Sequence, residues 1–249
     1  MKTGKLVFIA SVAGLTMFFA SCSETLTHAE DLITTSNAEK SSGALAYPGD
    51  SCTYSGILND EEKEGLMDMR EEEKLARDVY IYFYEMYDHL IFNNISKAEE
   101  AHTSAVSRLI NGYGLEDPAS TEVGKFNNPI YQYLYDSLTV AGSISLTEAL
   151  KTGAFIEEFD INDLNQLLVD TQNEDVYRVY SNLLQGYKNH LRAFTSVLIR
   201  IDETYEPVII SEQEYNEILN DDGSSEENSA DVNSNYPGTG DCDGTGPRF

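Results

Sequence analysis

Apolar residues recur at three- and four-residue steps through the middle of the chain, a spacing that places them on one face of an α-helix. Residues with capping side chains precede several of these stretches, and at Asn59, Ser96 and Ser145 a glutamate follows three residues later. The pattern predicts long helices at 59–87, 96–112, 145–168 and 173–198, and short ones at 129–142 and 211–219. No strand pattern of comparable length occurs in the sequence, which therefore predicts an all-α bundle.

The first residues have the features of an export signal. Lys2 and Lys5 precede an apolar run, 6–21, which is shorter than the roughly 20 residues that span a bilayer. The run ends in Phe-Ala-Ser before Cys22 and resembles a bacterial lipobox, which implies cleavage before Cys22 and attachment of lipid to it. The alternative is an ordinary signal peptide that leaves Cys22 as a thiol.

The sequence thus divides into a lipoprotein signal peptide (1–21), a polar tether (22–57), the helical bundle (58–219) and an acidic, disordered tail (220–249). A lipid anchor predicts an extracytoplasmic protein on a membrane, facing the periplasm or the cell surface. Cys52 and Cys242 would then share an oxidising compartment, where a disulfide between them is an open alternative.

Composition narrows the range of partners. The 249 residues include 43 Asp and Glu against 16 Lys and Arg, which gives a formal net charge of −27. Loss of the signal peptide would also remove Lys2 and Lys5 and make the net charge more negative. Such a surface repels phosphate backbones and excludes nucleic acid as a partner. Three cysteines are too few for a four-thiolate zinc or iron–sulfur site. A homodimer stays open.

Several acids and two histidines fall within the apolar faces of the predicted helices when each residue is advanced by 100°. They are, helix by helix, Glu72, then Glu99 and His102, then Glu157 and Asp160, and finally His190. Glu73 lies next nearest to the centre of its face after Glu72. The same geometry predicts that Glu71 and Glu158 point towards solvent.

Each of these residues alone has a simpler explanation. Glu99 could close a capping box with Ser96, Asp160 could cap a helix restarting at Ile161, and a lone core histidine is usually hydrogen-bonded. Together, four buried carboxylates and two imidazoles need a counter-charge, which two divalent cations would supply. The basic residues are expected mostly on outer faces: Lys74, Arg77, Arg108, Lys151, Arg178 and Lys188.

The arrangement resembles the di-iron carboxylate proteins with ferritin-like bundles, which carry acids and a Glu-x-x-His motif on four helices. More narrowly, the stretches 69–80, 153–161 and 189–194 are similar to the DUF2202 family of ferritin-like domains, over roughly residues 58–219. One departure is Tyr187, which stands where the general pattern has a glutamate three residues before His190. The preceding helix carries two acids, Glu157 and Asp160, where the general pattern has one, and these compensate for the missing glutamate.

This resemblance implies a ferritin-like four-helix bundle with additional short helices and a di-iron centre, with manganese as the other candidate metal. It also implies iron oxidation, or chemistry with dioxygen or peroxide. The rival hypothesis is a non-catalytic surface module that binds a partner, with a structural metal or none.

Overall fold

The structure is a computed structural model that describes residues 54–221. Within that range the chain forms α2 (Asp60–Tyr87), α3 (Leu90–Gly112), α4 (Pro129–Gly142), α5 (Leu146–Asp170), α6 (Glu174–Arg200) and α7 (Glu212–Asn220), without strands. The predicted all-α bundle is confirmed. The predicted signal peptide with Cys22, most of the tether, and the tail from residue 222 lie outside the described residues.

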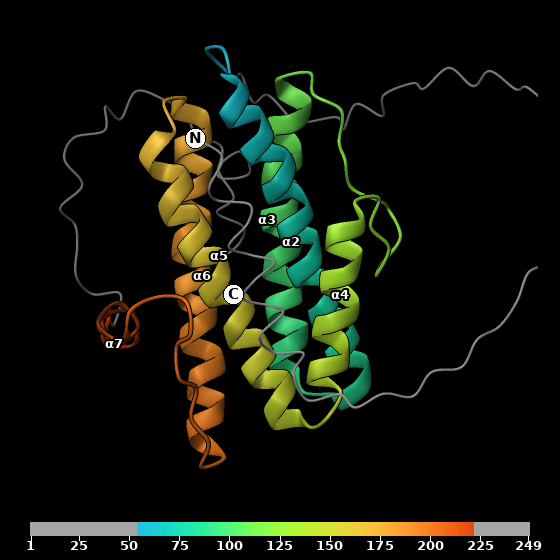
Figure 1. Ribbon diagram of the computed structural model, residues 1–249, viewed down its shortest axis with the longest axis vertical. Helices are drawn as coiled ribbons and strands as arrows, with labels where there is room; N and C mark the ends of the chain where they lie inside the picture. Colours follow the sequence, from blue (N-terminus) through green and yellow to red (C-terminus); the bar gives the residue numbers. More distant parts are fainter. Residues whose placement is uncertain (1–53, 222–249) are drawn as a thin grey trace, which may run out of the picture. The chain divides into compact units, whose positions relative to one another are not determined.

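Four long helices, α2, α3, α5 and α6, run side by side and enclose the core (Figure 1). The helix α2 packs against α3, and α5 packs against α6, while contacts of α3 with α6 and of α2 with α5 join the two pairs. The shorter α4 lies along α2 and α5, and α7 contacts α6. None of the described helices is both long and apolar enough to cross a lipid bilayer.

Capping side chains set most helix starts where the sequence predicted them. At the start of α2, the backbone N–H of Glu62 donates to Asn59 Oδ1 (2.8 Å), and the N–H of Asn59 donates to Glu62 Oε2 (2.9 Å). Ser145 and Asn173 cap α5 and α6 in a similar way. These contacts satisfy backbone N–H groups that have no partner within the helix.

The start of α3 differs from the prediction. The helix begins at Leu90, with His89 as its N-cap, rather than after Ser96. Histidine is not among the common capping residues, so no capping pattern marks this helix start in the sequence. Because α3 is already helical through Ser96, Glu99 closes no capping box. The helix α5 likewise runs unbroken through Asp160, which therefore caps nothing.

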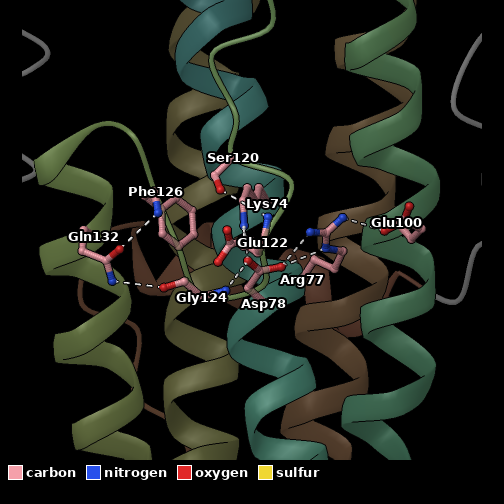
Figure 2. A network of polar contacts seen from close by, with 9 residues as sticks. All are labelled: Lys74, Arg77, Asp78, Glu100, Ser120, Glu122, Gly124, Phe126 and Gln132. Atoms are coloured by element: carbon pink, nitrogen blue, oxygen red, sulfur yellow. Dashed lines mark hydrogen bonds and ion pairs between the residues drawn. The ribbon is translucent and has the colours of Figure 1, made fainter. Parts of the chain in front are cut away.

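The segment 113–128, between α3 and α4, is held against α2 by a buried lysine (Figure 2). The prediction that Lys74 lies on an outer face is wrong, because its side chain is fully buried. Its ammonium pairs with Asp78, donates to the carbonyl oxygen of Glu122 (2.8 Å), and lies 4.4 Å from the ring centroid of Phe126. Helical periodicity could not reveal that a non-helical segment covers this side of α2.

The prediction that Glu158 points towards solvent is wrong for the same reason. The segment that follows α6 folds over α5, and Glu158 is fully buried beneath it. Its Oε1 accepts hydrogen bonds from the backbone N–H groups of Val208 (2.8 Å), Ile209 (2.5 Å) and Ile210 (2.9 Å). Its Oε2 accepts one from the hydroxyl of Tyr205. Glu158 therefore fastens this segment to the bundle.

Glu71 is also buried, at 2% exposure, although the sequence predicted that it points to solvent. Neither of its carboxylate oxygens has a hydrogen-bond partner among the described residues. Burial raises the pKa of Glu71 to about 7, against the opposing charges of Lys74 and Arg70.

Candidate metal centre

Two overlapping groups of metal-ligand side chains are buried in the core of the bundle. One group comprises Glu73, Glu99 and His102, and the other comprises Glu99, Glu157 and His190. In each group, one ligand atom from every residue lies within 4.8 Å of the others. Because these residues come from α2, α3, α5 and α6, each of the long helices supplies at least one of them.

Glu99 connects the two groups. Its Oε2 lies 2.9 Å from Nδ1 of His102, and its Oε1 lies 2.7 Å from Nδ1 of His190. On the outer side, His102 Nδ1 lies 3.6 Å from Glu73 Oε2, and His190 Nδ1 lies 3.3 Å from Glu157 Oε2. The two imidazole rings stack with their centroids 5.4 Å apart. Glu99 would therefore offer one carboxylate oxygen to a cation in each group.

The position of His102 depends on a glycine of the neighbouring helix. Glu99 and His102 stand one turn apart on α3, which brings both onto the face that meets α6. A Cβ atom on Gly186 of α6 would lie 2.6 Å from Cε1 and 2.7 Å from Nε2 of His102. The glycine therefore leaves the space that the imidazole ring fills.

Two buried tyrosines hold the outer carboxylates. The hydroxyl of Tyr80 donates to Glu157 Oε1 (2.6 Å), and that of Tyr187 donates to Glu73 Oε1 (2.5 Å). In both glutamates the other oxygen, Oε2, is the one that faces a histidine. Tyr187, noted in the sequence only as a departure from the ferritin-like pattern, thus positions a candidate ligand from α2.

The protonation states couple the acids to the histidines. Burial alone would raise the pKa of Glu99, but the charges of His190 and His102 lower it. Burial would lower the pKa of His190, but Glu157 and Glu99 raise it to about 9. Burial raises the pKa of Glu73 to about 8, against the effect of His102. The metal-free site therefore balances its charge with protons.

The structure brings together four of the six residues that the sequence proposed as ligands: Glu99, His102, Glu157 and His190. From α2 the residue in the group is Glu73, whereas Glu72 is buried beside it and accepts a hydrogen bond from the hydroxyl of Tyr131 (3.2 Å). Adjacent residues differ by 100° around a helix, and a wide apolar face accommodates both, so periodicity could not choose between them.

Asp160 is buried next to these groups without belonging to either. Burial, followed by the negative charges of Glu157, Glu72 and Glu73, raises its pKa well above the usual range for aspartate. Its side chain is therefore a further carboxylate within electrostatic reach of the centre.

The donor set fits a pair of divalent cations. Among the described residues, no lysine or arginine forms an ion pair with Glu73, Glu99 or Glu157, and Glu73 Oε2 is buried without a hydrogen bond. Four carboxylates, counting Asp160, balance two divalent ions when both imidazoles are neutral. A metal pair would thus neutralise charge that burial makes costly.

A family model described as "Uncharacterized protein domain (DUF2202)" matches residues 62–222, which include all of these side chains. The chain belongs to the DUF2202 family. It is 45% identical over 163 residues to the uncharacterized protein MJ0754 of Methanocaldococcus jannaschii, covering 65% of this chain and 88% of that protein. The crystal structure of that hypothetical protein, from Methanococcus jannaschii, matches with a TM-score of 0.66 at 44% identity, covering 68% of this chain and 97% of the other.

Proposed function

We propose that this DUF2202 protein is ferritin-like and holds two iron ions between α2, α3, α5 and α6. The observation that carries this proposal is Glu99, whose two oxygens face His102 and His190 at 2.9 and 2.7 Å. In di-metal carboxylate bundles, a Glu-x-x-His motif on one helix supplies ligands to the metal pair, and Glu99 and His102 form such a motif on α3. Oxygen and imidazole ligands suit iron, and they suit manganese as the alternative ion.

The proposed activity is oxidation of ferrous iron or reaction with dioxygen or peroxide. When bound, a pair of redox-active ions would supply the electrons for this chemistry, with dioxygen or peroxide as the oxidant. The chain's own contribution is to bind and orient: Tyr80 and Tyr187 hold Glu157 and Glu73, and burial keeps bulk water away from the ligand atoms. The histidines must lose their extra protons to bind metal.

We further propose that the protein is a lipoprotein outside the cytoplasm, anchored to a membrane through Cys22. The support is the sequence of its first residues, in which Lys2 and Lys5 precede a short apolar run that ends at a lipobox-like cysteine. The polar stretch that follows would separate the bundle from the membrane.

Metal analysis of the full-length protein, purified without oxygen, tests the proposed centre. We expect at least two iron or manganese ions per chain in the wild type, and substantial loss in His102→Ala and in His190→Ala, because each imidazole belongs to one of the two ligand groups.

A partner-binding module without metal would instead contain no stoichiometric metal in any variant. Wild-type protein without bound iron or manganese after reconstitution, or histidine variants with unchanged metal content, would contradict the proposal.

A further inference from the structure

A second group of acidic side chains lies where α2 meets α5, beside the metal centre. Asp68 and Glu72 stand one turn apart on α2, and Asp163 stands on α5, three residues after Asp160. We call Asp68, Glu72 and Asp163 the outer acid site. None of the three belongs to the two ligand groups that contain the histidines.

The antiparallel register of α2 and α5 brings these acids to the same level. Near the start of α2, a Cβ on Gly65 would lie 3.2 Å from Leu167 Cδ2, and towards its end Tyr80 donates to Glu157. Between these two contacts, the register places Asp68 beside Asp163 and Glu72 beside Asp160. The outer acid site therefore lies one helical turn from the centre.

Electrostatic coupling shows the same proximity. Burial and the charge of Asp68 raise the pKa of Asp163 to about 6. Among the described residues, neither Glu72 nor Asp163 forms an ion pair with lysine or arginine.

Two buried oxygens at this place lack hydrogen bonds. Glu72, 9% exposed, has Tyr131 as the donor to its Oε1, but its Oε2 has no partner in the described part of the chain. The hydroxyl of Tyr180, 1% exposed, also has none there, and a Cβ on Gly65 would lie 3.3 Å from it. Gly65 stands one turn before Asp68 on α2, so the hydroxyl of Tyr180 lies beside the Asp68 end of the outer acid site. Buried oxygens without hydrogen bonds cost free energy, which a bound cation would offset.

We propose that the outer acid site, together with the hydroxyl of Tyr180, binds a hard divalent cation and supplies the dinuclear centre with metal. Its donors are all oxygens, which suit Mn²⁺, Fe²⁺, Mg²⁺ or Ca²⁺ rather than metals that select sulfur. Like charges repel one another in the absence of a cation, and the bound ion would draw the three carboxylates together.

Exposure along the two helices gives the order in which a cation from solvent would meet these acids. Asp68 and Asp163 are partly exposed, whereas Glu72 and Asp160 are buried. Asp160 stands on α5 between Glu157 of the centre and Asp163 of the outer acid site, at a spacing of three residues from each. The supply role rests on the proposed function, whereas binding at the outer acid site does not.

Titration of the metal-free, full-length protein with Mn²⁺, followed by the loss of the free-ion electron paramagnetic resonance signal, tests binding. We expect the double variant Asp68→Asn/Asp163→Asn to bind one Mn²⁺ fewer per chain than Asp170→Asn, a control that removes an exposed charge from the same α5. The double variant His102→Ala/His190→Ala should lose the ions of the centre and keep one. Removal of mutually repelling acids should leave the fold intact, which circular dichroism checks.

Equal Mn²⁺ binding by the double aspartate variant and the Asp170→Asn control would overturn the outer acid site. Unchanged binding by the histidine variant would contradict the dinuclear centre instead, so the two failures are distinguishable. For the supply role, Fe²⁺ should load the centre at least about fivefold more slowly in the double aspartate variant, with the same final occupancy. A loading rate equal to that of the control would overturn that role.

Discussion

In the metal-free centre, protons on the buried histidines and on Glu73 balance the carboxylate charge that the proposed metal ions would neutralise. Burial alone would lower the pKa values of both histidines, but Glu157 and Glu99 raise that of His190 to about 9, and Glu99 and Glu73 raise that of His102. A metal ion binds the neutral ring, so binding must release these protons. Competition between protons and metal thus extends well above the ordinary histidine pKa of about 6.5.

The stability of the metal-free protein should therefore fall as pH rises from about 6.5 to 9. In this window His190, with a folded pKa of about 9, and Glu73, with one of about 8, hold protons that the unfolded chain has released. Bound metal becomes more stabilising over the same window. Melting temperatures measured with chelator and with Mn²⁺ should diverge as pH rises. A constant difference between the two melting temperatures would contradict these proton positions.

A single methyl group at Gly186 should disturb the centre more than the fold. In Gly186→Ala the new Cβ would meet the His102 ring at 2.6 Å, and the ring would have to move. Elsewhere in a helix the same change often stabilises by roughly 0.5–1 kcal/mol. We expect Mn²⁺ affinity to fall about tenfold or more while helical content stays unchanged. Wild-type affinity in this variant would show that His102 needs no fixed position.

At the scale of helices, the sequence predicted the features that depend on local interactions, namely helix starts and the buried face of each helix. Capping residues predicted the starts of α2, α5 and α6. Helical periodicity predicted that four ligand side chains point into the core: Glu99, His102, Glu157 and His190. The start of α3 was missed because His89 is an unusual cap. The buried positions of Lys74 and Glu158 were missed because non-helical segments cover them, and such long-range contacts leave no trace in helical periodicity.

Glu158 should stabilise the bundle without contributing to metal binding. Glu158→Ala removes the acceptor of three backbone N–H groups in the segment 201–211, and we expect it to lower the free energy of unfolding by at least about 2 kcal/mol. Urea unfolding measures this loss, with the exposed Asp170→Ala on the same helix as a control. Metal content per folded chain should match the wild type. An unaltered unfolding midpoint would rule out this fastening role.

At the scale of the whole molecule, the predicted lipid attachment would determine the cellular location of the protein. Cells grown with labelled fatty acid should incorporate label into the wild-type chain and not into Cys22→Ser, because only the cysteine thiol accepts lipid in a lipobox. Membrane fractionation should show the same difference. Equal labelling of both chains, or a wild type without label, would contradict the anchor.

The proposed dinuclear centre depends most on Glu99, and two neighbouring glutamates allow a matched test. Glu99 is fully buried between the histidines, whereas Glu100, the next residue on α3, is exposed. Both Glu→Gln changes keep the shape of the side chain and remove one charge. In the Asp68→Asn/Asp163→Asn background, which removes the outer acid site, anaerobic Fe²⁺ titration should give about two tightly bound ions per chain without further change and with Glu100→Gln, and fewer than one with Glu99→Gln. Two ions bound with unchanged affinity in Glu99→Gln would contradict the dinuclear centre.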